Sequence, residues 1–155
     1  MSARTLLFAS NRGFWLAMVP TAVLGVLLLV LILASRPAAE RASEFTARDN
    51  LRTAVVAARD VADREGSFAD AVPLALGVEA VADDLLFIDP DLASNDPDVV
   101  SVFATEGLWA GAARADTGAC FWIRVTPSGG EAVGTGSVCS GEAAAAARPG
   151  SWPSP

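Results

Sequence analysis

The most constraining feature of this sequence is an apolar run from Phe14 to Ala34 that contains no charged residue. A helix rises about 1.5 Å per residue, so the run would form a helix about 30 Å long, the thickness of a bilayer's hydrocarbon core. The alternative is a cleavable signal peptide, but its apolar core is usually shorter, and Ile32 and Pro37 stand where small residues would be needed. We therefore predict a retained transmembrane helix over residues 14–34.

The charges on either side of this run predict its orientation. Arg4 and Arg12 precede it without any acid, whereas the acids and arginines that directly follow it cancel. The positive-inside rule then keeps residues 1–13, a short leader, in the cytoplasm. The predicted localisation is the cell membrane, with a single span and an extracellular C-terminal domain.

The composition narrows the classes of function. The formal net charge is −7, and all 18 acidic residues follow the predicted anchor. An acidic surface repels phosphate backbones, so nucleic acid is not an expected partner. The chain has no histidine, which excludes histidine-based catalytic triads, and no glycine-rich phosphate loop opens a helix. We expect no enzyme activity and no cofactor.

The two cysteines, Cys120 and Cys139, both fall on the predicted extracellular side, where disulfides persist. Free thiols and metal ligands are the alternatives to a disulfide. Two cysteines in a chain without histidine cannot complete a tetrahedral zinc site from protein ligands alone. We therefore predict that Cys120 and Cys139 pair.

Helical signals continue beyond the anchor through residues 35–65. No Gly or Pro occurs from Ala38 to Glu65, and small or aliphatic residues recur every three or four positions as one stripe: Ala47, Leu51, Ala54, Val55, Ala58, Val61 and Ala62. Gly66 stands where helices commonly end. The pattern predicts an amphipathic stalk that continues the membrane helix.

Residues 66–98 are predicted to form a connecting region, with one short helix between Pro73 and Ala82. The apolar run 85–88 is expected to be anchored in the core. The acidic loop that follows could wrap Ca²⁺ through four carboxylates, Asp89, Asp91, Asp96 and Asp98. Their spacing does not match the EF-hand template, and Asp-Pro pairs are common in turns, so an ordinary turn is the alternative.

From residue 99 the apolar period changes to two. Turn residues separate four predicted antiparallel strands: Val99–Ala104, Leu108–Ala113, Ala119–Val125 and Glu131–Val138. Such a sheet can bury one face against the stalk and leave the other in water, and Trp109 and Trp122 are predicted to be packing residues. The predicted fold class is therefore α+β, a long N-terminal helix packed on a small antiparallel β-meander, with the disulfide, over residues 99–140. Residues 141–155 have low complexity, and we expect disorder or at most a short helical turn there.

The order of these features resembles the type IV pilins and pseudopilins, particularly pilin-like proteins of actinobacteria. Three local stretches carry the resemblance: Arg64-Glu65-Gly66-Ser67-Phe68, Gly118-Ala119-Cys120-Phe121-Trp122-Ile123 and Gly134-Thr135-Gly136-Ser137-Val138-Cys139. The resemblance implies a pilin-like fold and a structural role, without catalysis, in a type IV pilus or a type II secretion-like filament. The implied partners are the membrane, like subunits that contact the N-terminal helix, and the assembly platform.

In that family a prepilin-type peptidase cuts after a Gly preceded by basic residues, and Arg12-Gly13-Phe14 is similar to this site. The resemblance therefore implies cleavage between Gly13 and Phe14. The family's Glu at the fifth mature position falls at Met18, so a minor or tip pseudopilin fits better than a major pilin. The alternative function is a membrane-anchored extracellular binding or sensor domain that does not assemble.

Overall fold

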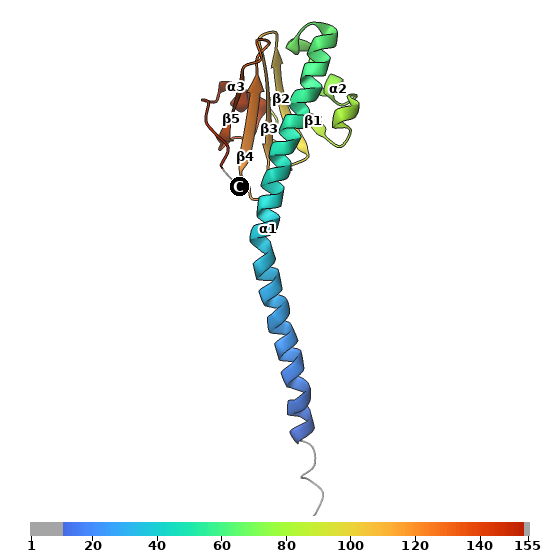
Figure 1. Ribbon diagram of the computed structural model, residues 1–155, viewed down its shortest axis with the longest axis vertical. Helices are drawn as coiled ribbons and strands as arrows, with labels where there is room; N and C mark the ends of the chain where they lie inside the picture. Colours follow the sequence, from blue (N-terminus) through green and yellow to red (C-terminus); the bar gives the residue numbers. More distant parts are fainter. Residues whose placement is uncertain (1–10, 154–155) are drawn as a thin grey trace, which may run out of the picture. The chain divides into compact units, whose positions relative to one another are not determined.

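The computed structural model describes residues 11–153, with side chains described at Leu24 and from residue 36 onward. The chain divides into two compact units, Met1–Ala38 and Ala39–Pro155, and helix α1, Asn11–Glu65, contributes to both (Figure 1). Within the described part of the chain, we find no helix with the length and apolarity needed to cross a membrane. The predicted anchor, 14–34, falls on residues whose side chains, Leu24 excepted, lie outside the described set, so the anchor stays a prediction.

The second half of α1 is the amphipathic helix that the sequence predicts. Six of the seven stripe residues are buried, Ala62 is half-buried, and Ala57 adds a further buried position. Gly66 ends the helix with a φ of 87°, and its backbone N–H donates to the carbonyl of Ala62 at 2.7 Å. Glycine suits this left-handed geometry because it has no Cβ. The predicted helix end is confirmed.

Five strands form one sheet in the order β1-β2-β3-β4-β5: Leu86–Ile88, Val99–Thr105, Leu108–Arg114, Cys120–Val125 and Glu131–Gly136. β2 to β5 are antiparallel neighbours and agree with the four predicted strands to within two residues at each end. β1 pairs parallel to β2 and was not predicted, because three residues are too few to display an alternating pattern. The α+β class, with one long helix and a mostly antiparallel sheet, is confirmed.

Alternation along the strands divides the sheet into two faces. The α1 face carries the larger set of apolar side chains, including Val102, Trp109, Phe121 and Ile123, which pack with the α1 stripe. Trp109 is fully buried, and its Nε1 donates to the backbone carbonyl of Ala71 at 3.2 Å. This face forms the main core of the C-terminal unit.

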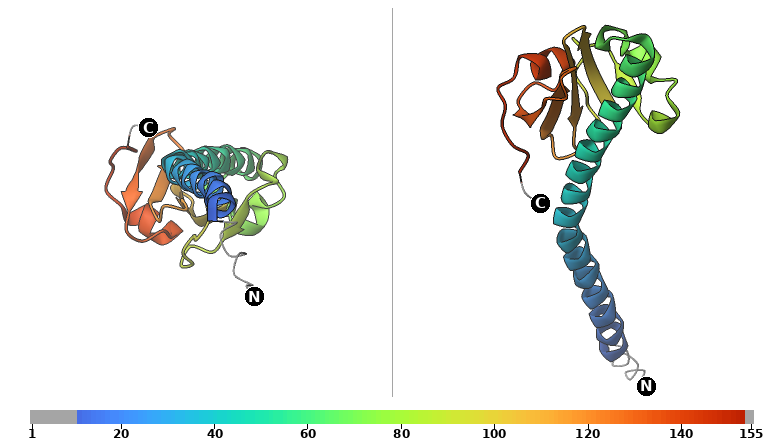
Figure 2. Two further views of the ribbon diagram at one scale, coloured as in Figure 1. Left: turned by 90° about the horizontal axis from the view of Figure 1, so that it is seen from below. Right: turned by 45° about the horizontal axis from the view of Figure 1, so that its top comes forward.

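The opposite face is also covered, contrary to the expectation that it would face water. Helix α3, Gly141–Ala146, lies across it, and the sheet lies between the C-terminal half of α1 and α3 (Figure 2). Ser140 caps α3 by accepting a hydrogen bond from the backbone of Ala143, and Arg124 donates to the carbonyls of Ala145 and Ala147. The arginine thus satisfies carbonyls that the helix end leaves without partners.

The tail after α3 is ordered as far as residue 153, which differs from the predicted disorder. The backbone N–H of Gly150 donates to Val133 on β5, and the indole of Trp152 donates to the carbonyls of Trp122 and Gly134 at 3.2 Å each. The Trp152 ring meets the ring of Phe121 edge-on, with 6.4 Å between centroids. The tail therefore passes the outer strand of the sheet and returns to the α1 face.

The connecting region contains three short helices rather than one. They are η1 Phe68–Asp70, α2 Pro73–Leu76 and η2 Ala80–Ala82, so the predicted helix between 73 and 82 is interrupted from Gly77. Each short helix places one apolar residue inward, namely Phe68, Leu76 and Ala82. Ala71, directly after η1, is also buried, whereas Val72, Leu74, Val78 and Val81 are exposed.

Candidate interaction surface

The predicted acidic loop does not gather its carboxylates around one point. In the described part of the chain, no three acidic, His or Cys side chains lie close enough together to hold a metal ion. The Asp96 carboxylate instead accepts a hydrogen bond from the backbone of Asp98, and the Asp98 carboxylate accepts one from Asn50 at 2.8 Å. These contacts tie the loop to itself and to α1, as in an ordinary turn.

The structure brings the two cysteines together as a disulfide, with 5.4 Å between the Cα atoms of Cys120 and Cys139. The bond joins β4 to the segment before α3. The carbonyl of Cys139 accepts a hydrogen bond from Ser94, so the same point also ties down the acidic loop. The pair belongs to the smaller apolar cluster on the α3 side of the sheet and stabilises that side.

The predicted cleavage site, Gly13 and Phe14, lies in the part of α1 for which only the backbone is described. Its side chains and their surroundings are outside the described residues. The cleavage implied by the resemblance therefore stays a prediction.

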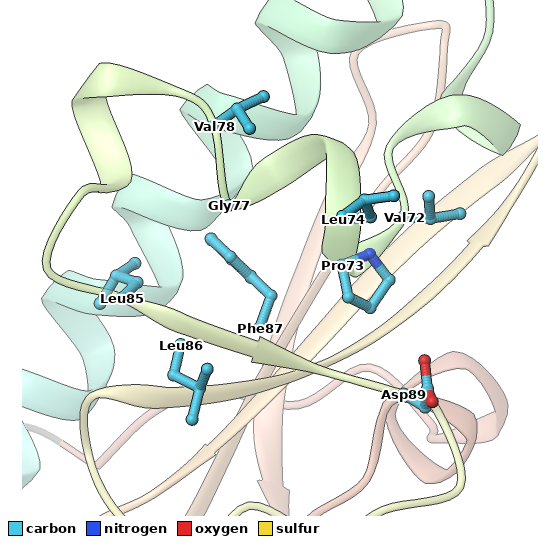
Figure 3. Close-up of a pocket in the computed structure, with 9 residues that line it drawn as sticks. All are labelled: Val72, Pro73, Leu74, Gly77, Val78, Leu85, Leu86, Phe87 and Asp89. Atoms are coloured by element: carbon cyan, nitrogen blue, oxygen red, sulfur yellow. The ribbon is translucent and has the colours of Figure 1, made fainter.

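A surface that the sequence did not predict lies between α2 and β1. It is an open groove of about 590 Å³, which we name the α2–β1 groove (Figure 3); it is lined by Val72, Pro73, Leu74, Gly77, Val78, Leu85, Leu86, Phe87 and Asp89. Three large apolar side chains here are strongly exposed, with Leu74 at 85%, Val78 at 75% and Leu86 at 60%. Neighbouring Val72 and Val81 are also exposed. This is a concentrated apolar patch, not one isolated exposed leucine.

The backbone explains why these side chains point outward. β1 alternates, so Phe87 is buried while Leu86 on the other side of the strand is exposed, and in Figure 3 the two side chains leave the strand in opposite directions. α2 has only four residues, and the one that is buried is Leu76. The expectation that the whole run 85–88 would be anchored in the core is therefore wrong: Phe87 is buried, Leu85 and Ile88 are half-buried, and Leu86 is exposed.

The surroundings of the groove are acidic. The sequence contains no Lys or Arg between Arg64 and Arg114, whereas this interval holds nine acids after the stalk: Asp70, Glu79, Asp83, Asp84, Asp89, Asp91, Asp96, Asp98 and Glu106. Asp83, Asp84 and Asp89 are all exposed, and Asp89 lines the groove itself. The local field is therefore negative.

Arg64 is the cation that reaches this region from the stalk. Its guanidinium pairs with the Glu79 carboxylate at 2.6 Å and with Glu65 at 3.2 Å. The hydrogen bond that Arg64 donates to the Glu79 carboxylate, followed by the one that it donates to Glu65, raises the pKa of Arg64 above its already high value. The ion pair links the connecting region to the end of α1. The exposed aspartates at the groove have no basic residue nearby in sequence.

No family model, no curated protein and no solved structure matches this chain. The α2–β1 groove therefore has to be interpreted from its own chemistry. Exposed apolar side chains and negative charge occur together here, and this combination suits a binding surface. The residues that line the groove do not include a convergent set of reactive groups. The sequence did contain a signal, the large apolar residues at 72, 74, 78, 81 and 86; those at 74, 78 and 81 keep a helical spacing, although α2 ends at Leu76.

Proposed function

We propose that this chain is a pilin-like structural subunit, comparable to a minor pseudopilin, that acts in a membrane-associated filament and catalyses no reaction. The observation that carries the proposal is the extent of α1 beyond the packed domain. α1 has 55 residues, but its first buried residue among those described is Ser43, its apolar stripe begins at Ala47, and residues 36–42 are all exposed. We infer that the part of α1 before the stripe takes its stabilising contacts from outside the unit Ala39–Pro155.

The apolar run 14–34 indicates where those contacts come from. Burying one large aliphatic side chain is worth about 1.5–3 kcal/mol, so leaving a run of such residues in water would be strongly unfavourable. Leu24, within the run, is 62% exposed. Lipid and the corresponding helices of like subunits are the environments that we propose for this segment.

In this proposal the two parts of the chain have separate tasks. The segment 14–34 holds the subunit in the membrane and packs laterally with like helices, and the unit Ala39–Pro155 is displayed outside the cell. The disulfide between Cys120 and Cys139 suits an oxidising exterior. The work of the protein is then association, with the sheet domain supplying the contact surfaces.

The N-terminal residue of the protein recovered from native membranes tests this proposal. Mass spectrometry of the N-terminal peptide should find Phe14 as the first residue if a prepilin-type peptidase has acted. A Gly13→Leu variant should then keep the leader and serve as the unprocessed standard. A native chain that begins at Met1 or Ser2 would contradict processing and the filament role with it.

A second candidate function is a membrane-anchored extracellular binding domain that does not assemble. The observation in its favour is the α2–β1 groove, whose exposed leucines and valines do not depend on lateral association. The two functions differ in one property, which is whether copies of α1 lie side by side in the membrane. Crosslinking between copies of α1 in native membranes measures that property.

A further inference from the structure

We propose that the α2–β1 groove docks a segment of another protein in which large apolar side chains stand next to lysine or arginine. This inference is independent of filament assembly, because every residue that carries it belongs to the unit Ala39–Pro155. It commits to a protein partner with a defined chemistry, apolar and basic.

The apolar half of the partner follows from what the groove exposes. Leu74, Val78 and Leu86 line the groove with most of their surface exposed, and the buried Phe87 also lines it. An inserted aliphatic or aromatic side chain would remove these groups from water while contacting a rigid core residue. Anchors of this kind carry most of the free energy of protein–protein binding.

The basic half follows from the charges around the groove. Asp89 lines it, and Asp83 and Asp84 directly precede the lining residue Leu85. All three aspartates are exposed, and they have no lysine or arginine within the sequence interval that builds the groove. A lysine or arginine beside the apolar anchor would therefore meet complementary charge, which steers association and sets specificity.

The same charges argue against a second copy of this domain as the occupant. The acids of the C-terminal unit far outnumber its arginines, and the groove-bearing interval is acidic throughout. Two such grooves face to face would place like charges opposite each other, which is unfavourable. A partner of opposite charge is favoured.

The test uses the full-length chain in detergent micelles and a short fluorescent peptide in which leucine and arginine alternate. Fluorescence anisotropy should show saturable binding beyond that of empty micelles, and binding should weaken as salt is raised. A peptide of the same length with glutamate in place of arginine should fail to bind. Binding should weaken about tenfold for Leu74→Asp, which places a charge in the apolar groove, a loss of about 1.4 kcal/mol.

Three further variants separate the groove from general charge attraction. Asp84→Asn/Asp89→Asn removes two charges at the groove, and Asp60→Asn/Asp63→Asn removes two exposed charges from α1 as its matched control. Val56→Asp, at a 46% exposed position of α1, is the control for Leu74→Asp. We expect weaker binding for the groove variants alone, with unchanged thermal unfolding.

Four results would overturn the proposal. They are binding no stronger than that of empty micelles, equal binding of the glutamate peptide, equal loss in the α1 control variants, and a homodimer that Leu74→Asp dissociates. The last result would assign the groove to a second copy of this chain.

Discussion

The two faces of the sheet are both buried, but they are buried by different means. The α1 face meets a long helix whose apolar stripe runs from Ala47 to Ala62, and its packing residues include Trp109 and Phe121. The α3 face meets a helix of six residues, and small side chains such as Ala110 and Ala112 accompany Trp122 and the half-buried Phe103. The α1 face holds its helix mainly by apolar contact, whereas the α3 face also uses specific bonds.

Those bonds are a disulfide and several hydrogen bonds. The disulfide anchors the chain directly before α3, Ser140 caps the start of α3, and Arg124 satisfies carbonyls at its end. Arg124 also lies over the Trp122 ring, at 5.7 Å from its centroid. An isolated helix of this length is unstable in water. A short helix can nevertheless cover a sheet when cross-links and caps compensate for the small apolar area that it buries.

The largest effect is expected on the α1 face. Replacing Trp109 by Ala should lower the free energy of unfolding by about 3–5 kcal/mol, because it opens a cavity in a fully buried site. It also leaves the carbonyl of Ala71 without its indole donor. Urea unfolding followed by circular dichroism measures this, with Val56→Ala on the exposed side of α1 as the control. A loss no greater than that of Val56→Ala would show that this face is not the main core.

The second effect concerns the α3 face. Replacing both Cys120 and Cys139 by Ala should cost about 3 kcal/mol, because the cross-link no longer restricts the unfolded chain. The loss should appear as earlier exchange of amide hydrogens in α3 than in the second half of α1.

Reduction of the native protein should raise its intact mass by two hydrogens. An unchanged mass would contradict the disulfide.

The third effect tests how closely the α3 face is packed. A Cβ added at Gly134 would lie 2.8 Å from the Cε2 atom of the buried Trp122 indole. Gly134→Ala should therefore cost about 1–3 kcal/mol by forcing that ring to shift. Gly107→Ala is the matched control, because a Cβ there meets nothing within 4 Å. Equal stability of the two variants in thermal unfolding would indicate that Trp122 has room to move.

The smallest effect tests the link between the two faces. Trp152→Ala removes two hydrogen bonds, the edge-on contact with Phe121, and a cation–π contact with Arg52. A loss of about 1–2 kcal/mol is expected, since Trp152 is only half-buried. Limited proteolysis should also cut the tail sooner than in Ser151→Ala, which changes an exposed neighbour. Equal cleavage rates would show that Trp152 does not hold the tail.

Periodicity accounts for what could be predicted from the sequence. Regular patterns over six or more residues mark the stripe on α1 and strands β2 to β5, and Gly66 marks the helix end. Each of these features was placed closely. The start of a short helix at Pro73 was predicted from the proline, but the end of α2 at Leu76 was not, and strand β1 has three residues, too few for an alternating pattern to emerge. The α2–β1 groove is built from these two elements, so its outline required the structure.

The ordered tail was missed for a different reason. Residues 141–155 are rich in alanine and proline, a composition typical of disorder, and their order depends on contacts distant in sequence. Arg48 of α1 donates to the carbonyl of Pro153 at 2.8 Å, and Trp152 reaches the backbone of Trp122. Local composition does not encode such partners.

The central claim is that copies of α1 lie side by side in the membrane. A Leu24→Cys/Ala39→Cys variant places free thiols at two exposed helix positions, and the native cysteines are already paired. Treatment of native membranes with a bismaleimide should give a ladder of covalent oligomers of this chain, while the matched two-thiol variant Glu106→Cys/Ser128→Cys, in the β2–β3 and β4–β5 turns, should give no such ladder. Monomers alone from the Leu24→Cys/Ala39→Cys variant would contradict the filament account and favour the non-assembling binding domain.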